Sequence, residues 1–348
     1  MKKVFVTGAT GQLGSALVER LIEEKEYEIT CMIHVLDNQD VSILTNLGIK
    51  KIVQGDLTKP ETYERQVPVG SIIFHCYSLS PGANAMPIVY DYHNLTASKR
   101  LLEVAERKKV HQLVYMSSCS VIGPKATKNH FINEDDPVGP DEPYGKSKLA
   151  VEKEVRAFYQ RTGIPALLLR IFPIYGQNTH PNSSPVRFCK LIQKKRFFIL
   201  GDGNNYFEFG YTRNVADGIV AATQSITKGC EIFNISEPEK RTYKEIITEI
   251  AKHINPNIKI THIPIPLAYI TGYLGNLLSV LLHQRFIFRM RSVRGLLGGW
   301  NADCSKLVQR TGYKQRYKLE QGITELVEYV RKNNLLEQEW KRPKEYDG

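Results

Sequence analysis

The sequence predicts an α/β protein with a doubly wound parallel sheet and a smaller region towards the C-terminus. The first half alternates short β-rich runs with segments of helical periodicity, a pattern typical of parallel sheets. Several runs are apolar throughout, as expected of strands that helices cover on both faces. A glycine-rich turn also joins the first run to the first helical segment.

The predicted elements follow one another in a regular order. Six strands are expected from the apolar runs Val4–Thr7, Tyr27–Ile33, Lys50–Gln54, Ser71–Cys76, Gln112–Ser118 and Ala166–Phe172. Three amphipathic helices are expected between them, at Ser15–Glu24, Asn94–Arg107 and Lys146–Gln160. Residues 1–174 are therefore predicted to form one sheet domain. After residue 174 the loops lengthen, so residues 175–348 are predicted to form mainly a second region, with some segments returning to the sheet.

Composition and charge narrow the class of protein. The chain has 348 residues, of which 42% are hydrophobic, enough for a large buried core. Its net charge of +11 favours anionic partners, while no zinc finger, basic zipper or RNA-binding motif predicts a specific nucleic-acid partner. The six cysteines are scattered without a CxxC pair, so we expect no disulfide framework, no metal site and a cytoplasmic setting. The N-terminal apolar run is too short to predict a signal peptide.

The turn TGATGQLG (Thr7–Gly14) follows a predicted strand and opens a predicted helix. Its three glycines allow a tight turn, close approach of the backbone to a pyrophosphate, and close packing of helix on strand. The helix N-terminus would present free amides and a positive dipole end to the phosphates. The first half is therefore predicted to be an NAD(P)-binding Rossmann domain, and the turn residues expected at the cofactor are Gly8, Thr10, Gly11, Gln12, Leu13 and Gly14.

The residue at the end of the second strand distinguishes NAD from NADP, because it lies beside the adenosine ribose of the bound cofactor. An acid there binds the 2′-hydroxyl of NAD, whereas a basic residue accommodates the 2′-phosphate of NADP. The strand ends at Ile33 and His34, which favours NADP(H) over NAD(H) and places His34 either at a 2′-phosphate or in solvent. Asp37 could serve as the acid if the strand ran further.

In their order and spacing, the motifs resemble those of the extended short-chain dehydrogenase/reductase family over almost the whole chain. The resembling stretches are TGATGQLG, GDL (Gly55–Leu57), FHCYS (Phe74–Ser78), YMSSCSVIG (Tyr115–Gly123), YGKSK (Tyr144–Lys148), RIFPIYG (Arg170–Gly176) and GDGNNYFEF (Gly201–Phe209). The resemblance implies that Asp56 and Leu57 lie beside the adenine, and that Tyr77 and Pro173 lie near the cofactor.

The resemblance also implies that Tyr144 is the catalytic acid and base, with Lys148 as its partner and Ser118 as the third member. A free phenol has a pKa near ~10, too high for a base at neutral pH. A lysine one helical turn away lies on the same face, and its charge, with that of an oxidised nicotinamide, favours the phenolate. Ser118 ends a strand at the ligand-binding edge and could hold the reacting oxygen. Lys148 is also expected to bond the cofactor ribose. Asn94 could cap its helix or bear on the site, and the capping role is favoured.

Departures from the sugar-nucleotide branch of the family indicate an apolar substrate. Cys119 and Ser120 stand where the family's 4,6-dehydratases carry an Asp-Glu pair, which argues against dehydratase chemistry. Pro173 and Phe207 stand where many members carry Asn and Arg, and they cannot replace those donors to a nucleotide diphosphate. The run SSCSVIGP and the tail segment WNADCSKLVQRTGYK (Trp300–Lys314) instead resemble the 3-beta-hydroxysteroid dehydrogenase-like branch.

The predicted function is that of an NAD(P)-dependent oxidoreductase that interconverts a secondary alcohol and a ketone on a small hydrophobic substrate, sterol-like or lipid-like. One alternative is a nucleotide-sugar 4-epimerase that retains its NAD. Another is a non-catalytic, nucleotide-sensing binding protein, against which the intact set of Ser118, Tyr144 and Lys148 argues. The chain could act alone or as a homodimer.

One later segment, Ile263–Leu282, carries no formal charge over a length that would allow a membrane span. Its prolines and glycines weaken that interpretation, and a buried helix or a lid at the substrate entrance is favoured. The next stretch, HQRFIFRMRSVR, places four arginines among apolar residues. Because a surface-lying segment has that composition, peripheral membrane contact through residues 263–294 is the alternative.

Overall fold

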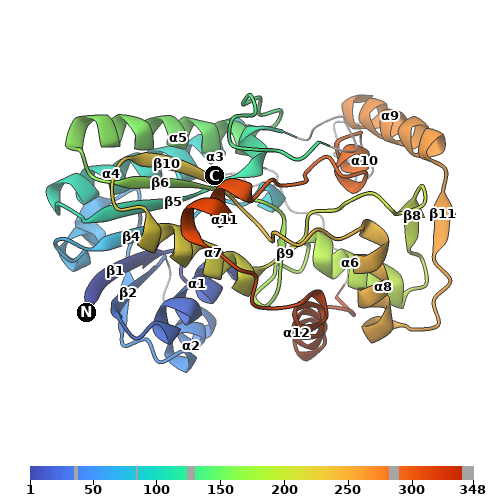
Figure 1. The fold of residues 1–348 in the computed structure, drawn as a ribbon, viewed down its shortest axis with the longest axis horizontal. Helices are drawn as coiled ribbons and strands as arrows, with labels where there is room; N and C mark the ends of the chain where they lie inside the picture. The colour runs from blue at the N-terminus through green and yellow to red at the C-terminus, as the bar shows by residue number, and fades with distance from the viewer. Residues whose placement is uncertain (35–37, 84, 124–129, 282–289, 339–348) are drawn as a thin grey trace.

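Seven parallel strands form the central sheet of the computed structural model, which describes residues 1–34, 38–83, 85–123, 130–281 and 290–338 (Figure 1). The strands are β1 (Lys2–Thr7), β2 (Tyr27–Ile33), β3 (Lys51–Gln54), β4 (Ile72–His75), β5 (Gln112–Ser118), β6 (Ala166–Ile171) and β10 (Cys230–Ile235). Their spatial order is β10-β6-β5-β4-β1-β2-β3. The order reverses between β1 and β4, and sheets of this kind bind ligands outside the carboxyl ends of the strands at such a point.

Helices cover both faces of the sheet, because alternate residues of each strand point to opposite faces. Val4 of β1 shares a buried cluster with Leu17 and Ile219, whereas Phe5 belongs to a second cluster with Val104 and Val155. The first cluster lies under α1 (Gln12–Glu23) and α7 (Thr212–Ser225), and the second under α4 (Ala97–Arg107) and α5 (Pro143–Thr162). Figure 1 shows α4 and α5 above the sheet and α1 and α7 below it. The predicted doubly wound α/β fold is confirmed.

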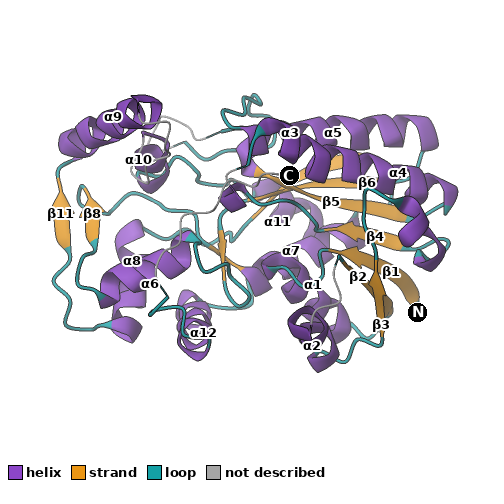
Figure 2. Cartoon of the chain, turned by 180° about the vertical axis from the view of Figure 1, so that it is seen from behind, coloured by secondary structure: helices purple, strands orange, loops and turns teal. Residues whose placement is uncertain are grey.

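A second core, rich in aromatic rings, lies beside the sheet. It is surrounded by α6 (Ser184–Gln193), α8 (Tyr243–Ile254) and α12 (Leu319–Lys332), which Figure 2 shows to one side of the strands. Tyr175 stacks on Phe209 with ring centroids 4.3 Å apart. The rings of Phe207 and Tyr243 are 4.8 Å apart. Two short strand pairs border this region: β7 (Ile174–Tyr175) with β9 (Gly210–Tyr211), and β8 (Phe198–Leu200) with β11 (Thr261–Ile263).

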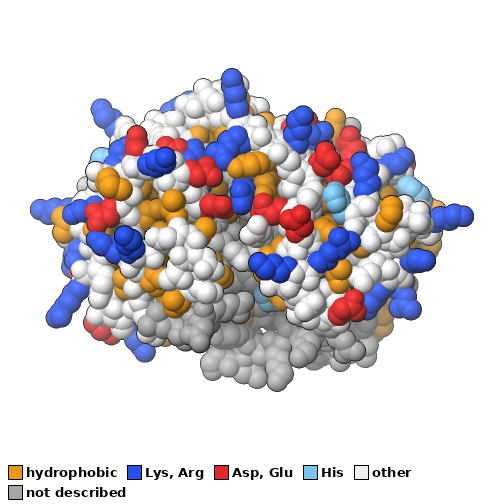
Figure 3. Space-filling view, turned by 90° about the horizontal axis from the view of Figure 1, so that it is seen from below, with side chains coloured by type: hydrophobic (Ala, Val, Ile, Leu, Met, Phe, Trp, Pro, Cys, Tyr) orange, Lys and Arg blue, Asp and Glu red, His pale blue; other side chains and the backbone are white. Residues whose placement is uncertain are grey.

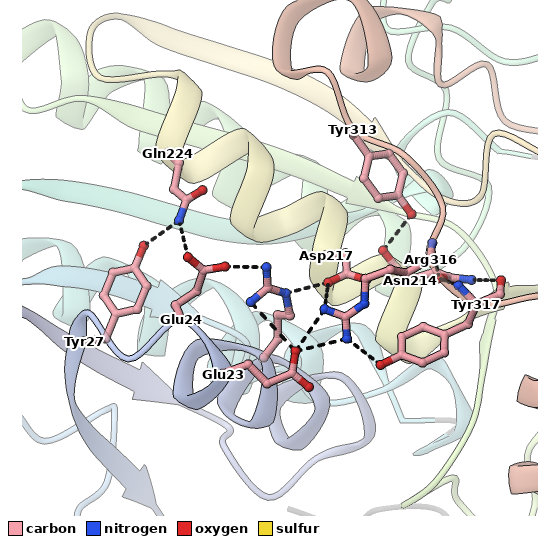
Figure 4. A network of polar contacts seen from close by, with 10 residues as sticks. Glu23, Glu24, Tyr27, Asn214, Asp217, Gln224, Tyr313, Arg316 and Tyr317 are labelled. Carbon is pink, nitrogen blue, oxygen red and sulfur yellow. Dashed lines mark hydrogen bonds and ion pairs between the residues drawn. The ribbon is translucent and has the colours of Figure 1, made fainter.

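Several segments from the second half of the sequence pack with the sheet. The strand β10 pairs with β6, and α11 (Ser305–Thr311) packs against β10 and α7. Figure 4 shows the polar network that joins α1, α7 and the segment Tyr313–Tyr317. In it Arg20 Nε lies 2.5 Å from Asp217 Oδ1, and Arg316 Nη1 lies 3.0 Å from Glu23 Oε2. These ion pairs fix the late segments to the first helix of the chain.

Some element predictions were wrong. A helix, α2 (Asn38–Asn46), was not predicted. The helix expected to begin at Asn94 is preceded by α3 (Pro87–Tyr90) and a π-helical turn (Asp91–Thr96), so Asn94 lies inside a helical segment and caps nothing.

The uncharged segment after β11 forms α9 (Ile265–Leu281), followed by α10 (Met290–Leu296). The prediction of a buried helix is wrong, because Ile270 is 57% exposed and Tyr273 and Leu281 are each 65% exposed. The described contacts of α9 are with α10 and the β8–β11 pair, so its place at a substrate entrance stays a prediction. No helix within the described ranges has both the length and the apolarity to cross a bilayer.

Candidate active site

Close backbone contacts shape the glycine turn between β1 and α1. Gly8 has a φ of +66°, a conformation that strains any residue with a side chain. A Cβ on Gly14 would lie 2.0 Å from the carbonyl oxygen of Gly8, and a Cβ on Gly8 would lie 2.6 Å from the amide nitrogen of Tyr77. The turn therefore tolerates no side chain at Gly8 or Gly14, and it brings together the loops that follow β1 and β4.

The start of α1 fits the diphosphate of a dinucleotide. The helix begins at Gln12, so its first amides have no partners within the helix and point towards the turn. The side-chain amide nitrogen of Gln12 is buried with no hydrogen-bond partner. An anionic group there would satisfy the buried donor and the helix amides together. Thr10 is half-buried beside them, while the side chain of Leu13 packs against the core below and supports the turn.

The residues predicted at the adenosine lie after β2 and β3. The Asp56 carboxylate accepts hydrogen bonds from the amide and hydroxyl of Thr58, at 2.9 and 2.8 Å. Partial burial acts to raise the pKa of Asp56, but these bonds and the nearby His34 outweigh it, so the pKa is lowered. His34 itself is exposed, and Leu57 is buried in the core under α4. Asp37 lies outside the described residues.

Tyr144 lies in the first turn of α5, close to the side chains of Ser118 and Ser78. Burial raises the pKa of the Tyr144 phenol well above its usual value, and these two neighbouring hydroxyls oppose part of the rise. Ser118 ends β5 and also accepts a hydrogen bond from the Ser120 amide at 3.2 Å. The ring of Tyr144 meets that of Tyr90 edge-on, with centroids 6.0 Å apart. The structure therefore places the predicted base and the predicted oxygen-binding hydroxyl near each other.

Lys148 lies one helical turn after Tyr144 and is buried. Its Nζ donates to the carbonyl oxygen of Met116 at 2.8 Å and lies 4.8 and 5.9 Å from the ring centroids of Tyr115 and Tyr144. Burial lowers the pKa of Lys148 to about 7. The ammonium is thus held near the phenol, and it gains most from any group that brings negative charge into the site.

A buried ion pair supports Lys148 from below. Glu152, one turn further along α5, receives two hydrogen bonds of 3.0 Å each from the guanidinium of Arg170 on β6. The hydroxyl of Ser117 on β5 donates to the same carboxylate at 2.6 Å. Three elements are therefore tied together directly under the lysine, which fixes the rotation of α5.

Asn94 joins the loop after β4 to the start of α5. Its Oδ1 accepts from the Leu79 amide at 2.8 Å, and its Nδ2 donates to the Ser147 hydroxyl at 2.9 Å. Ser147 in turn donates to the carbonyl oxygen of Tyr144 at 2.8 Å. Asn94 therefore positions the helix turn that carries Tyr144, through a long-range contact, and the predicted capping role is wrong.

Two site residues were missed by sequence reasoning. Ser78 lies close to Tyr144, and its place just after a strand at the ligand-binding edge was the available signal. His75 at the end of β4 lies 2.8 Å from Thr7 Oγ1 and 2.9 Å from Ser98 Oγ, fully inside the protein. Burial lowers the pKa of His75 to about 3, so a neutral imidazole joins β1 to α4 beneath the turn.

The remaining predicted residues are less closely tied to the catalytic group. The Tyr77 hydroxyl lies 3.2 Å from His93 Nδ1, in the loop that the glycine turn contacts. The carbonyl oxygen of Pro173 accepts from the Gly210 amide at 2.8 Å, which joins β6 to the second region. Phe207 packs among the rings of the aromatic core, so its side chain belongs to the scaffold.

Cys76 directly follows β4 and lies close to the glycine turn. Burial raises the pKa of Cys76 to about 12, and all six cysteines of the chain are free. Within the described ranges, His, Cys, Asp and Glu side chains form no group of three that could hold a metal ion.

Comparison with known proteins places the chain in a family. The family model described as "NAD dependent epimerase/dehydratase family" matches residues 4–236. A 4-epimerase of N-acetyl-alpha-D-glucosaminyl-diphospho-ditrans,octacis-undecaprenol from Escherichia coli O157:H7 is 24% identical over 329 residues, which cover 94% of each chain. Sterol-4-alpha-carboxylate 3-dehydrogenase, decarboxylating, from Saccharomyces cerevisiae is 26% identical, with 94% of this chain and 97% of that protein covered.

A solved structure shows the same fold. The UDP-glucuronic acid 4-epimerase of Bacillus cereus, in complex with UDP-glucuronic acid and NAD, superposes with a TM-score of 0.74 at 21% identity, covering 95% of this chain and 99% of that one. The chain is therefore an enzyme of the NAD dependent epimerase/dehydratase family, a group of extended short-chain dehydrogenase/reductases.

Proposed function

We propose that this protein is a 4-epimerase of a sugar carried on a diphosphate, and that it keeps one NAD through each turnover. The observation that carries the proposal is the placement of Tyr144 close to Ser118, with Lys148 Nζ 5.9 Å from the centroid of the Tyr144 ring. This group transfers a proton to or from an alcohol oxygen, as epimerisation by oxidation and reduction requires. A bound NAD would supply the hydride exchange with the sugar carbon that inversion requires.

The chain's own groups carry the proton and hold the sugar. Ser118 donates to the reacting oxygen, and Tyr144 removes its proton as the alcohol becomes a ketone. After the ketone has presented its other face, Tyr144 returns the same proton, so the reaction has no net oxidation. Lys148 stabilises the phenolate form of Tyr144 during both the oxidation and the reduction, because its positive charge is held close to the ring.

Arg187 supports a diphosphate as the carrier. It lies in the first turn of α6, after a loop whose Asn178 donates to Ser15 of α1 at 2.9 Å. Its Nε is buried with no hydrogen-bond partner, and no carboxylate among the described residues pairs with it. Burial lowers the pKa of Arg187, so an anionic ligand would be bound strongly. This guanidinium can supply the donor that Phe207 cannot.

NAD is the proposed cofactor in place of the predicted NADP(H). The preference for NADP(H) rested on His34, and the structure places the Asp56 carboxylate close enough to His34 for their charges to interact. A carboxylate there repels a 2′-phosphate. The compared epimerase structure also holds NAD.

A dehydrogenase acting on a hydrophobic alcohol is the second candidate. It is the function that the sequence analysis favoured, and the similarity to the sterol-4-alpha-carboxylate 3-dehydrogenase supports it. The two 4-epimerases compared above outweigh it, because both act on sugars linked to a diphosphate and Arg187 offers a matching donor.

The test is inversion at C4 without added cofactor. Purified protein is incubated with UDP-glucose, UDP-N-acetylglucosamine or a polyprenyl-diphospho-N-acetylglucosamine, and the products are followed by NMR. We expect conversion of at least one of them by wild type and none by Tyr144→Phe, with the bound nucleotide released only on denaturation. Steady formation of NADH from an apolar alcohol and added NAD, with no C4 inversion, would establish the dehydrogenase instead.

A further inference from the structure

The helix α9 presents a large apolar surface. It contains no charged residue, and its exposed large side chains are Leu267, Tyr269, Ile270, Tyr273, Leu274, Leu277, Leu278 and Leu281, each between 39% and 65% exposed. The opposite side of the molecule looks different: Figure 3 shows apolar side chains there in small patches among charges of both signs. A surface as apolar as that of α9 marks a site of contact with a partner or a membrane.

The exposed side chains of α9 are ordered around the helix. At about 100° per residue, Leu267, Ile270, Leu274, Leu277 and Leu281 fall on one stripe. The two tyrosines fall along one border of this stripe. Tyrosine at the edge of an apolar face is typical of segments that lie at a membrane interface, where the ring is buried and the hydroxyl stays in the polar layer.

The side of α9 that faces the protein is narrow and made of small residues. Ala268 is fully buried, and Gly272 is buried against α10. A Cβ on Gly272 would lie 2.9 Å from Val293 Cγ2 and 3.4 Å from the Cα of Met290. Because α10 packs closely against the side of α9 that carries Ala268 and Gly272, the apolar stripe on the other side of the helix faces away from the protein.

The sequence around α9 has the charge that an anionic surface attracts. No Asp or Glu occurs between Glu249 and Asp303, whereas Arg285, Arg289, Arg291 and Arg294 all follow the helix. Arg294 is exposed on α10, the helix that packs directly on α9. An apolar stripe beside an acid-free, arginine-rich stretch matches a bilayer with anionic headgroups, because both parts of the surface then find their complement.

We propose that α9 docks this protein on the surface of an anionic lipid bilayer, lying in the plane of the membrane with its leucine stripe among the acyl chains. The helix is held parallel to the surface by its tyrosine border and by Arg294, which is exposed on α10. A second copy of the chain is a poorer partner, because two copies joined through α9 would bring their two exposed Arg294 side chains into the same interface. The proposal stands on this surface and not on the reaction assigned above.

The test measures sedimentation of the full-length protein with vesicles, in the absence of any substrate. Vesicles of phosphatidylcholine alone are compared with vesicles containing about one-third phosphatidylglycerol. The variant Ile270→Gln/Leu274→Gln/Leu277→Gln removes the stripe but keeps good helix formers. Val69→Gln/Ile88→Gln/Val138→Gln is the matched control, since those three side chains are 66%, 67% and 46% exposed elsewhere on the surface.

We expect wild type and the control to bind the anionic vesicles, and the α9 variant to lose at least tenfold in affinity at an unchanged melting temperature. Arg294→Gln should weaken binding about fivefold on anionic vesicles and leave neutral vesicles unaffected. The proposal is overturned if the wild-type protein does not bind anionic vesicles, or if the α9 variant binds them as tightly as wild type does. It is also overturned if sedimentation velocity shows a wild-type dimer that the α9 variant dissociates while vesicles have no effect. C4 inversion of a water-soluble UDP-sugar reports separately on the proposed function.

Discussion

Glu152 and Arg170 form a two-pronged ion pair beneath the candidate active site, with both nitrogen–oxygen distances at 3.0 Å and both side chains only 3% exposed. The pair joins α5, which carries Tyr144 and Lys148, to β6. A charge buried this deeply is tolerated because it is fully hydrogen-bonded, and the loss of one partner would leave the other unpaired.

Glu152→Gln should therefore destabilise the protein by about 3–5 kcal/mol, because the Arg170 charge would stay buried without its carboxylate. The control is Glu154→Gln on the same helix, whose pair with Lys99 at 3.5 Å is largely exposed. That change should cost about 0–1 kcal/mol. Chemical denaturation of both variants measures the difference, and equal losses would contradict the proposed support of α5.

Tyr144→Phe should lower kcat by about 10²–10⁴-fold, because the proton-transfer group is removed while the ring keeps its contact with Tyr90. Affinity for NAD should change little, since the substitution leaves the glycine turn at the start of α1 untouched. Turnover and fluorescence titration with NADH check the two parts. A variant that kept most of its turnover would exclude Tyr144 as the acid and base.

Gly14→Ala should mainly lower the stability of the fold, whereas Gly11→Ala should mainly weaken NAD binding. A Cβ on Gly14 would overlap the Gly8 carbonyl at 2.0 Å, so the backbone must move and the unfolding free energy should fall by about 1–3 kcal/mol or more. A Cβ on Gly11 meets Gly8 at 3.4 Å, an ordinary contact, and should mainly block approach of the diphosphate. Melting curves and NAD titration separate these outcomes, and a stable Gly14→Ala protein with full NAD affinity would contradict the turn geometry.

Lys148→Met should change how stability depends on pH. The pKa of Lys148 is lowered to about 7 by burial, from an ordinary value of 10.5. Between these two pH values the unfolded chain binds the extra proton, so wild-type stability gains from this group as pH rises, by at most about 1.4 kcal/mol per pH unit.

The Lys148→Met variant lacks this gain, so its stability relative to wild type should decline from pH 7 towards pH 10. The control is Lys146→Met, on the exposed side of the same helix, which should follow the wild-type profile. Denaturant unfolding at several pH values measures all three proteins. A constant difference between wild type and Lys148→Met would show that the ammonium is not buried.

Arg187→Met should raise KM for a UDP-sugar by about 10–100-fold with little change in kcat, because a charged hydrogen bond to a diphosphate contributes about 1.5–3 kcal/mol to binding. Arg196→Met is the control, since Arg196 is exposed in the loop before β8. Steady-state kinetics of both variants decide the matter. An unchanged KM would exclude a contact between Arg187 and the diphosphate. The second candidate function, a dehydrogenase acting on a hydrophobic alcohol, would then be favoured.

Local patterns predicted much of this molecule because they depend on neighbours in the sequence. The strand, glycine turn and helix of residues 4–23 follow from apolar runs and from glycines that backbone geometry requires. The four-residue spacing of Tyr144 and Lys148 places both on one side of α5 in any helix. Ser118 was predicted from the resemblance of its motif to that of the family, and its place at the end of a buried strand agrees with that role.

Only the tertiary structure decided the rest, because it depends on residues far apart in the chain. Asn94 works through Ser147 rather than as a cap, and Phe207 fills an aromatic core rather than facing a ligand. The exposure of α9 likewise depends on tertiary packing, because its apolar composition would suit a buried helix equally well. Only a narrow side of the helix packs against α10, so the apolar stripe faces outwards. The sequence by itself thus determined the family, the glycine turn and the tyrosine–lysine pair, whereas the partners of those residues and the outer surface depended on how distant segments pack.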